Sequence, residues 1–457
     1  MTLDQLTKIF YGTFIHTPSF GEVEILTKTV IGINSSGTII FIEKNVLNLS
    51  TIILKLTDNI QNIEILDISN DPLKFFFPGF IDTHIHASQY PNNGIFGNST
   101  LLDWLETYTF PLESSLKDLK KAELVYTKCI EKLLSNGTTC ASYYATIDTN
   151  STNLLADLCL KLGQRAFIGK ICMNQNSPNY YIETFEESKL STLKVLNHII
   201  KIDPNKNLIQ PILTPRFAPS CNSSLLNWLG ELRNDKDLYL QTHLSENLKE
   251  INWVKELFPQ SKTYTDVYND FNLLSSKTIL AHAIHLSNDE IELIKSKDSC
   301  ISHCPISNSS ITSGECRVKQ LISKGIKISL GTDCSAGFSP SILQTAKHAL
   351  LVSRHLSMKT ENDLDKLSIK DVLYLSTNGG AKCLKLDDKL GTFDQGKQFD
   401  VQLIDLNFNN IDLFEWQLPS DKDDDEIWNN ILAKWLFNGD DRNTIKVWVN
   451  GKQVYNQ

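Results

Sequence analysis

Short hydrophobic runs alternate with segments of helical periodicity through the middle of the chain, from about residue 75 to 390. One run ends at His84, and seven more predict strands at residues 140–144, 166–172, 209–214, 238–244, 278–283, 299–304 and 327–333. In one intervening segment apolar residues recur with helical spacing, and this predicts a helix capped by Ser115 and ended by Gly137. Eight such repeats favour an α/β fold, a (β/α)₈ TIM-type barrel with its active site at the carboxyl ends of the strands. A doubly wound open sheet is the alternative.

The two ends of the chain show a different pattern. Residues 6–70 contain short β-branched runs, such as Thr38 to Ile42, and residues 445–455 resemble a hairpin around Asn450-Gly451. Neither flank has enough strands for a stable sheet, so we expect the two to combine into one small β-sandwich domain. The predicted boundaries are residues 1–76 and 390–457 for the sandwich and 77–389 for the metal-dependent barrel. The acidic run 421–426 predicts a solvated loop.

Composition narrows the class of protein. The chain has 457 residues, of which 41% are hydrophobic and 21% charged, as in ordinary globular proteins. A net charge of −9 argues against nucleic acid as the main partner. The chain has no apolar run long enough to span a membrane and no signal peptide pattern at its start, so we expect no membrane partner and a cytoplasmic location. Ten scattered cysteines without a CxxC pair suggest free thiols.

The most informative motif is the apolar strand that ends in His84-Ile85-His86. Because strand side chains alternate between faces, His84 and His86 share a face. Two neutral imidazoles at the end of a buried strand can form the first pair of ligands of a divalent metal ion. A histidine pair at a strand edge without a metal is the other interpretation.

Later strand ends add further polar groups. His243, with Glu246 close behind it, ends one predicted strand, His282 ends the next, and Asp333 ends the last. A buried carboxylate such as that of Asp333 needs a partner or a metal ion. Each residue taken singly is more often a core histidine or a helix cap, but the four groups at successive strand ends together favour a metal-dependent active site.

With these motifs the sequence resembles the amidohydrolase superfamily and, within it, the guanine deaminases. The resemblance extends from Pro78-Gly79-Phe80-Ile81-Asp82-Thr83-His84-Ile85-His86 to Gly331-Thr332-Asp333. The motifs that separate this branch from its relatives are His86-Ala87-Ser88-Gln89-Tyr90, Tyr108-Thr109-Phe110-Pro111, Thr214-Pro215-Arg216-Phe217 and Thr242-His243-Leu244-Ser245-Glu246.

The resemblance implies a catalytic centre with one zinc ion per chain, held by His84, His86, His243 and Asp333. A zinc-activated hydroxide would attack C2 of guanine to give xanthine and ammonia. Glu246 would carry a proton to the ring nitrogen, and Asp333 would take the proton of the water. His282 would stabilise the tetrahedral oxygen.

The resemblance also implies how the substrate is held. Gln89, Arg216 and Phe217 would select guanine, together with His243, Glu246 and Asp333, and the protein would be a homodimer. A hydrolase acting on another aminated heterocycle, such as a pterin, a triazine or oxidised guanine, is the alternative enzyme. A catalytically silent barrel that serves as a scaffold is the alternative outside the enzyme class. A two-metal amidohydrolase is disfavoured because the fourth strand ends in Thr214-Pro215-Arg216 and carries no bridging Lys or Glu, whereas Lys170 lies on the third.

Overall fold

The computed structural model describes residues 6–56, 63–418 and 425–457. The chain forms two compact units. One contains Met1–Ile81, Leu133–Thr139 and Ser368–Gln457, and the other contains Asp82–Lys132 and Cys140–Leu367. The sequence-based boundaries at residues 77 and 389 stay a prediction. Of the acidic run 421–426, residues 421–424 lie outside the described residues, and Asp425 begins a helix.

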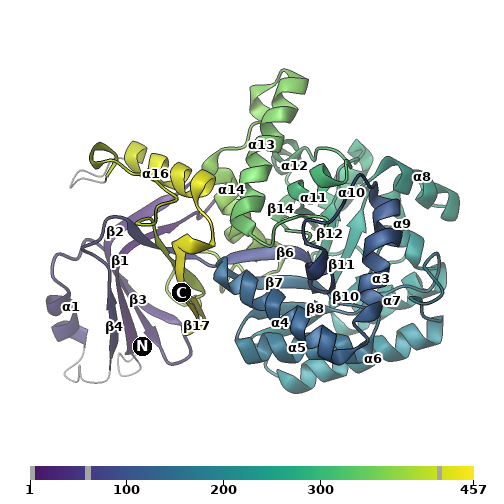
Figure 1. The fold of residues 1–457 in the computed structure, drawn as a ribbon, viewed down its shortest axis with the longest axis horizontal. Coiled ribbons are helices and arrows are strands. Elements are labelled where there is room, and N and C mark those ends of the chain that lie inside the picture. Colours follow the sequence, from purple (N-terminus) through teal and green to yellow (C-terminus); the bar gives the residue numbers. More distant parts are fainter. Residues whose placement is uncertain (1–5, 57–62, 419–424) are drawn as a thin grey trace. The chain divides into compact units, whose positions relative to one another are not determined.

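The first unit is built on an eight-stranded sheet that joins both ends of the chain, as predicted (Figure 1). Its order is β17-β16-β15-β5-β1-β2-β3, with β4 paired to β1. The strands are β1 (Leu6–His16), β2 (Glu24–Asn34), β3 (Ile39–Glu43), β4 (Glu64–Asp67), β5 (Lys74–Pro78), β15 (Val401–Asp405), β16 (Thr444–Val449) and β17 (Lys452–Asn456). The unit also contains α1 (Leu49–Leu56), α14 (Ile369–Ser376), α15 (Asn378–Cys383) and α16 (Asp425–Asn438).

Aromatic packing ties the two flanks together. Phe10 of β1 stacks on Phe399, with ring centroids 4.1 Å apart, and meets Trp448 of β16 edge-on at 5.4 Å. All three rings are buried in one hydrophobic cluster that also contains Phe76 of β5. Since each flank supplies only part of this cluster, neither buries its own aromatic residues alone.

The second sheet is the predicted barrel. Its strands lie in chain order, and neighbouring strands from the second to the eighth pair in parallel. Backbone hydrogen bonds from Asp333 N to His84 O (2.8 Å) and from His86 N to Cys334 O (3.1 Å) join the last segment to the first strand. The eight strands are β6 (Phe80–His86), β7 (Thr138–Tyr144), β8 (Arg165–Gly169), β10 (Ile209–Pro215), β11 (Tyr239–Leu244), β12 (Thr278–His282), β13 (Cys300–His303) and β14 (Lys327–Leu330), and a short β9 (Ile171–Cys172) pairs with β10.

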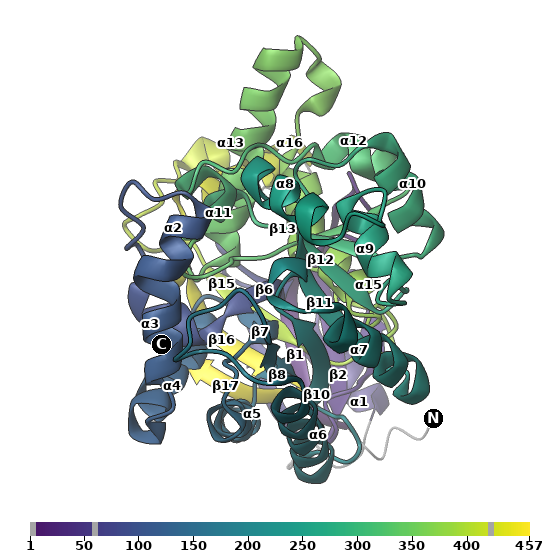
Figure 2. The ribbon, with the colours of Figure 1, turned by 90° about the vertical axis from the view of Figure 1, so that its right-hand side faces the viewer.

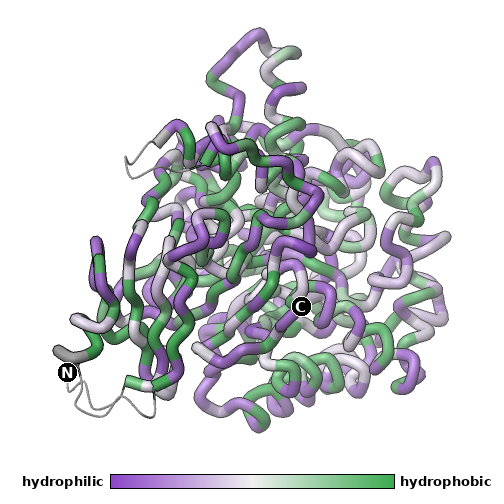
Figure 3. Tube along the Cα trace, turned by 60° about the vertical axis from the view of Figure 1, so that its left-hand side comes forward, coloured by the Kyte–Doolittle hydropathy of each residue, from purple (hydrophilic) through white to green (hydrophobic). Residues whose placement is uncertain are grey.

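Amphipathic helices surround these strands (Figure 2). Hydrophobic and hydrophilic residues interchange along them in Figure 3, as the sequence pattern requires. They are α4 (Leu119–Ser135), α5 (Thr149–Leu162), α6 (Phe185–Ile202), α7 (Ser223–Lys236), α8 (Leu248–Leu257), α9 (Tyr264–Asp270), α10 (Asn288–Ser296), α11 (Pro305–Ser310), α12 (Val318–Ser323) and α13 (Ile342–Thr360). None of the helices among the described residues combines the length and the apolar character needed to cross a membrane. All ten cysteines are buried.

The predicted cap at Ser115 is wrong. The helix begins at Leu119, and the carboxylate of Asp118 accepts hydrogen bonds from the backbone N–H groups of Lys120 and Lys121. Ser115 instead ends the preceding helix α3 (Phe110–Ser115), where its hydroxyl donates to the carbonyl of Leu112. The apolar residues begin at Leu116, between the short helix α3 and the 17-residue helix α4, so their spacing alone did not show where the second helix begins.

The connection between β6 and α4 is long and contains several short helical segments. It consists of η3 (Ala87–Asn92), α2 (Leu101–Trp104), the π-helical turn η4 (Leu105–Thr109) and α3. Gln89 lies on η3 and Glu113 on α3, and both side chains are buried. This connection therefore delivers two buried polar groups to the barrel unit.

Candidate active site

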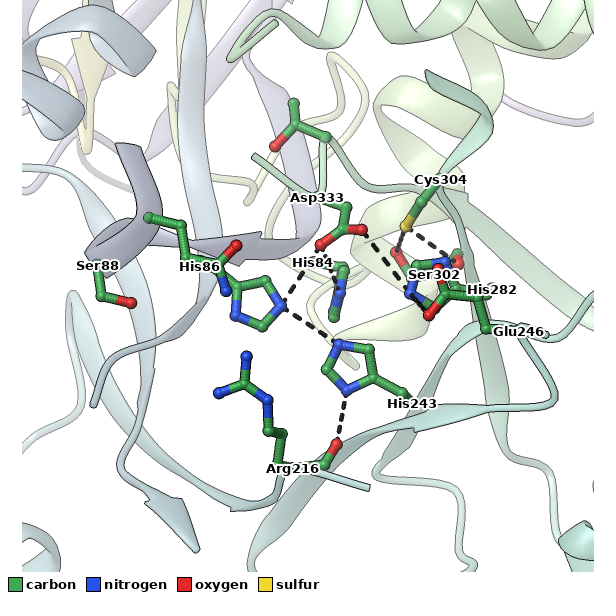
Figure 4. A network of polar contacts seen from close by, with 12 residues as sticks. His84, His86, Ser88, Arg216, His243, Glu246, His282, Ser302, Cys304 and Asp333 are labelled. Atoms are coloured by element: carbon green, nitrogen blue, oxygen red, sulfur yellow. Dashed lines mark hydrogen bonds and ion pairs between the residues drawn. The ribbon is translucent and has the colours of Figure 1, made fainter. Parts of the chain in front are cut away.

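Three imidazoles and one carboxylate meet at the carboxyl ends of the barrel strands. His84 and His86 come from β6, His243 from β11, and Asp333 from the loop after β14 (Figure 4). The Nε2 atoms of His84 and His86 lie 3.2 and 3.4 Å from Oδ1 of Asp333. Nε2 of His86 lies 3.3 Å from Nε2 of His243. Two atoms bonded tetrahedrally to one zinc ion at 2.0–2.1 Å are about 3.4 Å apart, so these spacings suit ligands of a single ion.

A fifth group, His282 at the end of β12, lies beside this cluster. His84, His243, His282 and Asp333 each offer a ligand atom, and these atoms lie within 4.8 Å of one another. This set differs from the predicted one in containing His282 instead of His86. Nε2 of His282 is 3.8 Å from Asp333, farther than Nε2 of His86, and lies 3.4 Å from Oε2 of Glu246. The shorter contacts of His86 favour the predicted set, and the carboxyl contact of His282 favours a role beside the ion.

The fixed tautomer of His243 supports metal binding. Its Nδ1 lies 2.6 Å from the carbonyl oxygen of Arg216, which can only accept, so Nδ1 carries the proton and Nε2 keeps its lone pair. His282 is held in the same way, with Nδ1 2.9 Å from Oδ1 of Asn308. Among the described residues, Nε2 of His84 and of His282 are buried without a hydrogen-bond partner. Buried nitrogen atoms left in this way are stabilised by a ligand such as a metal ion.

Burial sets the charge of the cluster. It lowers the pKa of His84, and it holds the pKa of His86 and of His243 well below the usual value, so these rings are neutral, as metal ligands must be. Burial acts in the opposite direction on Asp333, but the contact with the imidazole of His84 outweighs it and lowers the pKa of this carboxyl. Burial, followed by the charge of Asp333, holds the pKa of Glu246 well above its usual value. The site thus contains one carboxyl group with a lowered pKa, Asp333, and one with a raised pKa, Glu246.

The backbone at the strand ends is strained. His282 and Asp333 have φ angles of 69° and 45°, in the left-handed region that residues with side chains avoid at a cost of about 1–3 kcal/mol. Asp82 holds the second of these segments, because its carboxylate accepts hydrogen bonds from the backbone N–H (3.1 Å) and the hydroxyl (2.5 Å) of Thr332. The predicted strand through Asp333 in fact ends at Leu330, and this left-handed turn brings the carboxylate to the histidines.

The predicted substrate selectors lie beside the cluster. Gln89, Arg216 and Phe217 line one pocket with His86, His243, Glu246 and Asp333, and apolar side chains complete its wall. These are Leu101, Trp104, Leu105, Ile311 and Ala336. The empty space in the pocket is about 390 Å³. Seven of the nine predicted site residues therefore line the pocket. His84 and His282 belong to the metal cluster but do not line the pocket.

The structure adds a residue that sequence reasoning missed. Glu113 is buried, and its carboxylate binds the guanidinium of Arg216 through two contacts, from Nη1 at 2.8 Å and from Nη2 at 3.2 Å. It also accepts hydrogen bonds from Nε2 of Gln89 (2.8 Å) and from the hydroxyl of Tyr181 (2.7 Å). We call Gln89, Glu113, Tyr181 and Arg216 the recognition network. The only sequence signal for this network beyond Gln89 and Arg216 was the place of Glu113, two residues after Phe110-Pro111. Tyr181 had no sequence signal.

Comparison with known proteins decides the family. The model of the amidohydrolase family matches residues 75–454. The chain belongs to the amidohydrolase family. It is 46% identical to a probable guanine deaminase of Schizosaccharomyces pombe, over 98% of this chain and 83% of that protein. It is 43% identical to a guanine deaminase of Dictyostelium discoideum, over 99% of both chains. A crystal structure of guanine deaminase from C. acetobutylicum with bound guanine in the active site aligns with a TM-score of 0.86 and 34% identity, over 98% of this chain and all of that one.

Proposed function

We propose that this protein is a guanine deaminase, a hydrolase that converts guanine and water to xanthine and ammonia. The observation that supports the proposal is one pocket lined by His86, His243 and Asp333 of the metal cluster, by the buried carboxyl of Glu246 and by the donor fork of Arg216. The relatives named guanine deaminases, which match nearly the whole chain, support it.

The metal is the first element of the proposal. We infer one zinc ion per chain, held by His84, His86, His243 and Asp333, because three neutral imidazoles and one carboxylate form a donor set that zinc accepts. When bound, such an ion supplies Lewis acidity and lowers the pKa of a water ligand to about 7.

Substrate orientation follows from the groups across the pocket from the cluster. Arg216 has five N–H donors and can face the C6 carbonyl of guanine, while Gln89 can bind the same edge of the ring. Phe217, at 6% exposure, offers an apolar contact to the ring. Held in this way, C2 and its amino group are directed toward Glu246 and Asp333.

The proton transfers use two carboxyl groups of opposite state. Water oxygen bonds to C2 while Glu246 gives its proton to the neighbouring ring nitrogen, N3, which takes up the displaced electron pair. Asp333 accepts one proton from the water and returns it to the amino group. The C2–N bond then breaks to release ammonia, and the second water proton passes from the oxygen to Glu246, which leaves the C2 carbonyl of xanthine and restores the Glu246 carboxyl. His282, whose Nε2 lies 3.4 Å from Oε2 of Glu246 and 3.8 Å from Oδ2 of Asp333, is placed to stabilise the oxygen that bonds to C2.

The assembly and location rest on the family resemblance. We infer a homodimer in the cytoplasm with guanine as its small-molecule partner. Size-exclusion chromatography with light scattering measures the first of these directly, and fractionation of source cells measures the second.

Two alternatives predict different results. A hydrolase for pterins, triazines or oxidised guanine would turn these rings over faster than guanine. A silent scaffold has no need of Glu246 and the histidines, and burying such groups without a ligand costs stability.

The test is turnover of guanine by the zinc-loaded protein, measured as equal amounts of xanthine and ammonia. Parallel initial rates on a pterin, a triazine and oxidised guanine separate the enzyme alternatives. If protein with its zinc site filled consumes no guanine, the proposal is rejected.

A further inference from the structure

The recognition network contains a buried carboxylate that the proposed chemistry does not use. Glu113 lies outside the groups that line the pocket, and its side chain has no exposed surface. Oε1 receives Arg216 Nη2 and Gln89 Nε2, and Oε2 receives Arg216 Nη1 and the Tyr181 hydroxyl. A buried carboxylate with two donors on each oxygen is a fixed element, because moving it breaks several charge-assisted bonds at once.

Glu113 fixes the direction of the Gln89 amide. A carboxylate only accepts hydrogen bonds, so the NH₂ group of Gln89 must face it and the carbonyl Oε1 must face away. Among the described residues, Oε1 of Gln89 is buried without a hydrogen-bond partner. Because Gln89 lines the pocket, this unsatisfied acceptor is available to an N–H group of a ligand.

Glu113 also removes the net charge of Arg216. The two side chains are buried, and the pair is bidentate. Only two of the five N–H groups of a guanidinium are used in such a pair, so the others still donate. The pocket thus contains a donor fork without the net positive charge that would attract an anion.

We propose that Glu113 is a positioning residue that makes the pocket specific for a neutral lactam edge, a ring C=O next to a ring N–H. Arg216 donates to the carbonyl, and Gln89 accepts from the N–H. A 6-aminopurine offers the opposite order, an amino donor next to a ring acceptor, so the fixed amide opposes it. A ring anion is opposed because the Glu113 carboxylate has already neutralised Arg216. This inference rests on the proposed function for its substrate, guanine, which has this lactam edge at C6 and N1.

The experiment compares dissociation constants, measured by calorimetry on zinc-loaded protein, so that the result does not depend on turnover. The ligands are hypoxanthine, a neutral lactam without the reactive amino group, urate, which has the same edge on an anion, and adenine, a 6-aminopurine. Glu113→Gln keeps the size of the side chain but removes its charge and lets the Gln89 amide turn. We expect hypoxanthine to bind about tenfold more weakly and urate about tenfold more tightly, with the preference for hypoxanthine over adenine reduced.

Two further variants complete the design. Glu113→Asp keeps the charge but shortens the reach to Gln89, so hypoxanthine and urate, which share the lactam edge, both bind more weakly while adenine does not. It also preserves the test if Glu113→Gln fails to fold. Glu231→Gln makes the same charge change at an exposed position and leaves all three constants unchanged.

A parallel loss of all three ligands in the Glu113 variants would overturn the inference, since a merely structural residue weakens every ligand. If wild-type protein turns over guanine and this parallel loss is seen, the role of Glu113 fails and the proposed function stands. If wild-type protein does not turn over guanine but urate binding rises in Glu113→Gln, the function fails and the role of Glu113 stands.

Discussion

The metal cluster and the recognition network adjoin one pocket, but they are built in different ways. The cluster takes its histidines from the ends of β6 and β11 and its carboxylate from just after β14. The network takes its residues from η3, α3, the loop before α6 and the end of β10. The parallel strands of the barrel fix the positions of the metal cluster residues. The buried carboxylate of Glu113 fixes the residues of the recognition network. A site can thus combine a rigid scaffold with a locally assembled polar network.

The largest expected effect is on the cluster. His84→Ala removes a ligand at the centre of the group, so we expect zinc affinity to fall by more than about a hundredfold and turnover to fall with it. Zinc content is measured by elemental analysis after dialysis. His198→Ala removes a surface imidazole that pairs with Asp157 and should keep its zinc. Full zinc occupancy in His84→Ala would contradict the assignment of this ligand.

Glu246→Gln separates proton transfer from metal binding. We expect kcat for guanine to fall by about 10²- to 10⁴-fold, since the amide cannot carry the proton, while zinc content stays at the wild-type level. Glu292→Gln is the matched control at an exposed position. If Glu246→Gln loses its zinc, the carboxyl is a metal ligand. If the variant keeps the wild-type kcat, the carboxyl takes no part in proton transfer.

Arg216→Ala tests the network. It removes the donor fork and leaves the Glu113 carboxylate buried without its partner, so we expect kcat/KM for guanine to fall by about a hundredfold and the free energy of unfolding to fall by about 3–5 kcal/mol. The double variant Arg216→Ala, Glu113→Ala should regain part of the stability but none of the turnover. Wild-type turnover in Arg216→Ala would remove this residue from the binding groups. Zinc content should be unaffected in both variants.

Tyr181→Phe should have the smallest effect. It removes one of the four hydrogen bonds to Glu113 and leaves the pair with Arg216 intact. A single hydrogen bond to a group that keeps its other partners contributes about 0.5–1.5 kcal/mol, so kcat/KM should fall about two- to tenfold. Steady-state rates on guanine measure this, and a loss as large as that of Arg216→Ala would place Tyr181 in the pocket itself.

The sequence predicted the barrel and the cluster because both leave a local signal. A hydrophobic strand that ends in His84-Ile85-His86 specifies which face and which end of the strand the imidazoles occupy. The flanking sheet was also predictable, since neither flank alone has enough strands.

The burial of Glu113 and the position of Asp333 could not be predicted, because both depend on how distant parts of the chain fold together. Glu113 lies in a short helix with no polar motif, and its burial follows only from how the connection between β6 and α4 folds. The position of Asp333 depends on a left-handed turn beyond the end of β14, which no periodicity signals. Spacing alone likewise left open whether His86 or His282 completes the group with His84, His243 and Asp333.

Anomalous diffraction at the zinc edge from crystals of zinc-loaded protein tests the central claim most directly. The account predicts one peak per chain, within about 2.0–2.2 Å of the Nε2 atoms of His84, His86 and His243 and of a carboxylate oxygen of Asp333. A peak bonded to His282 in place of His86, or no peak at this group, would contradict it.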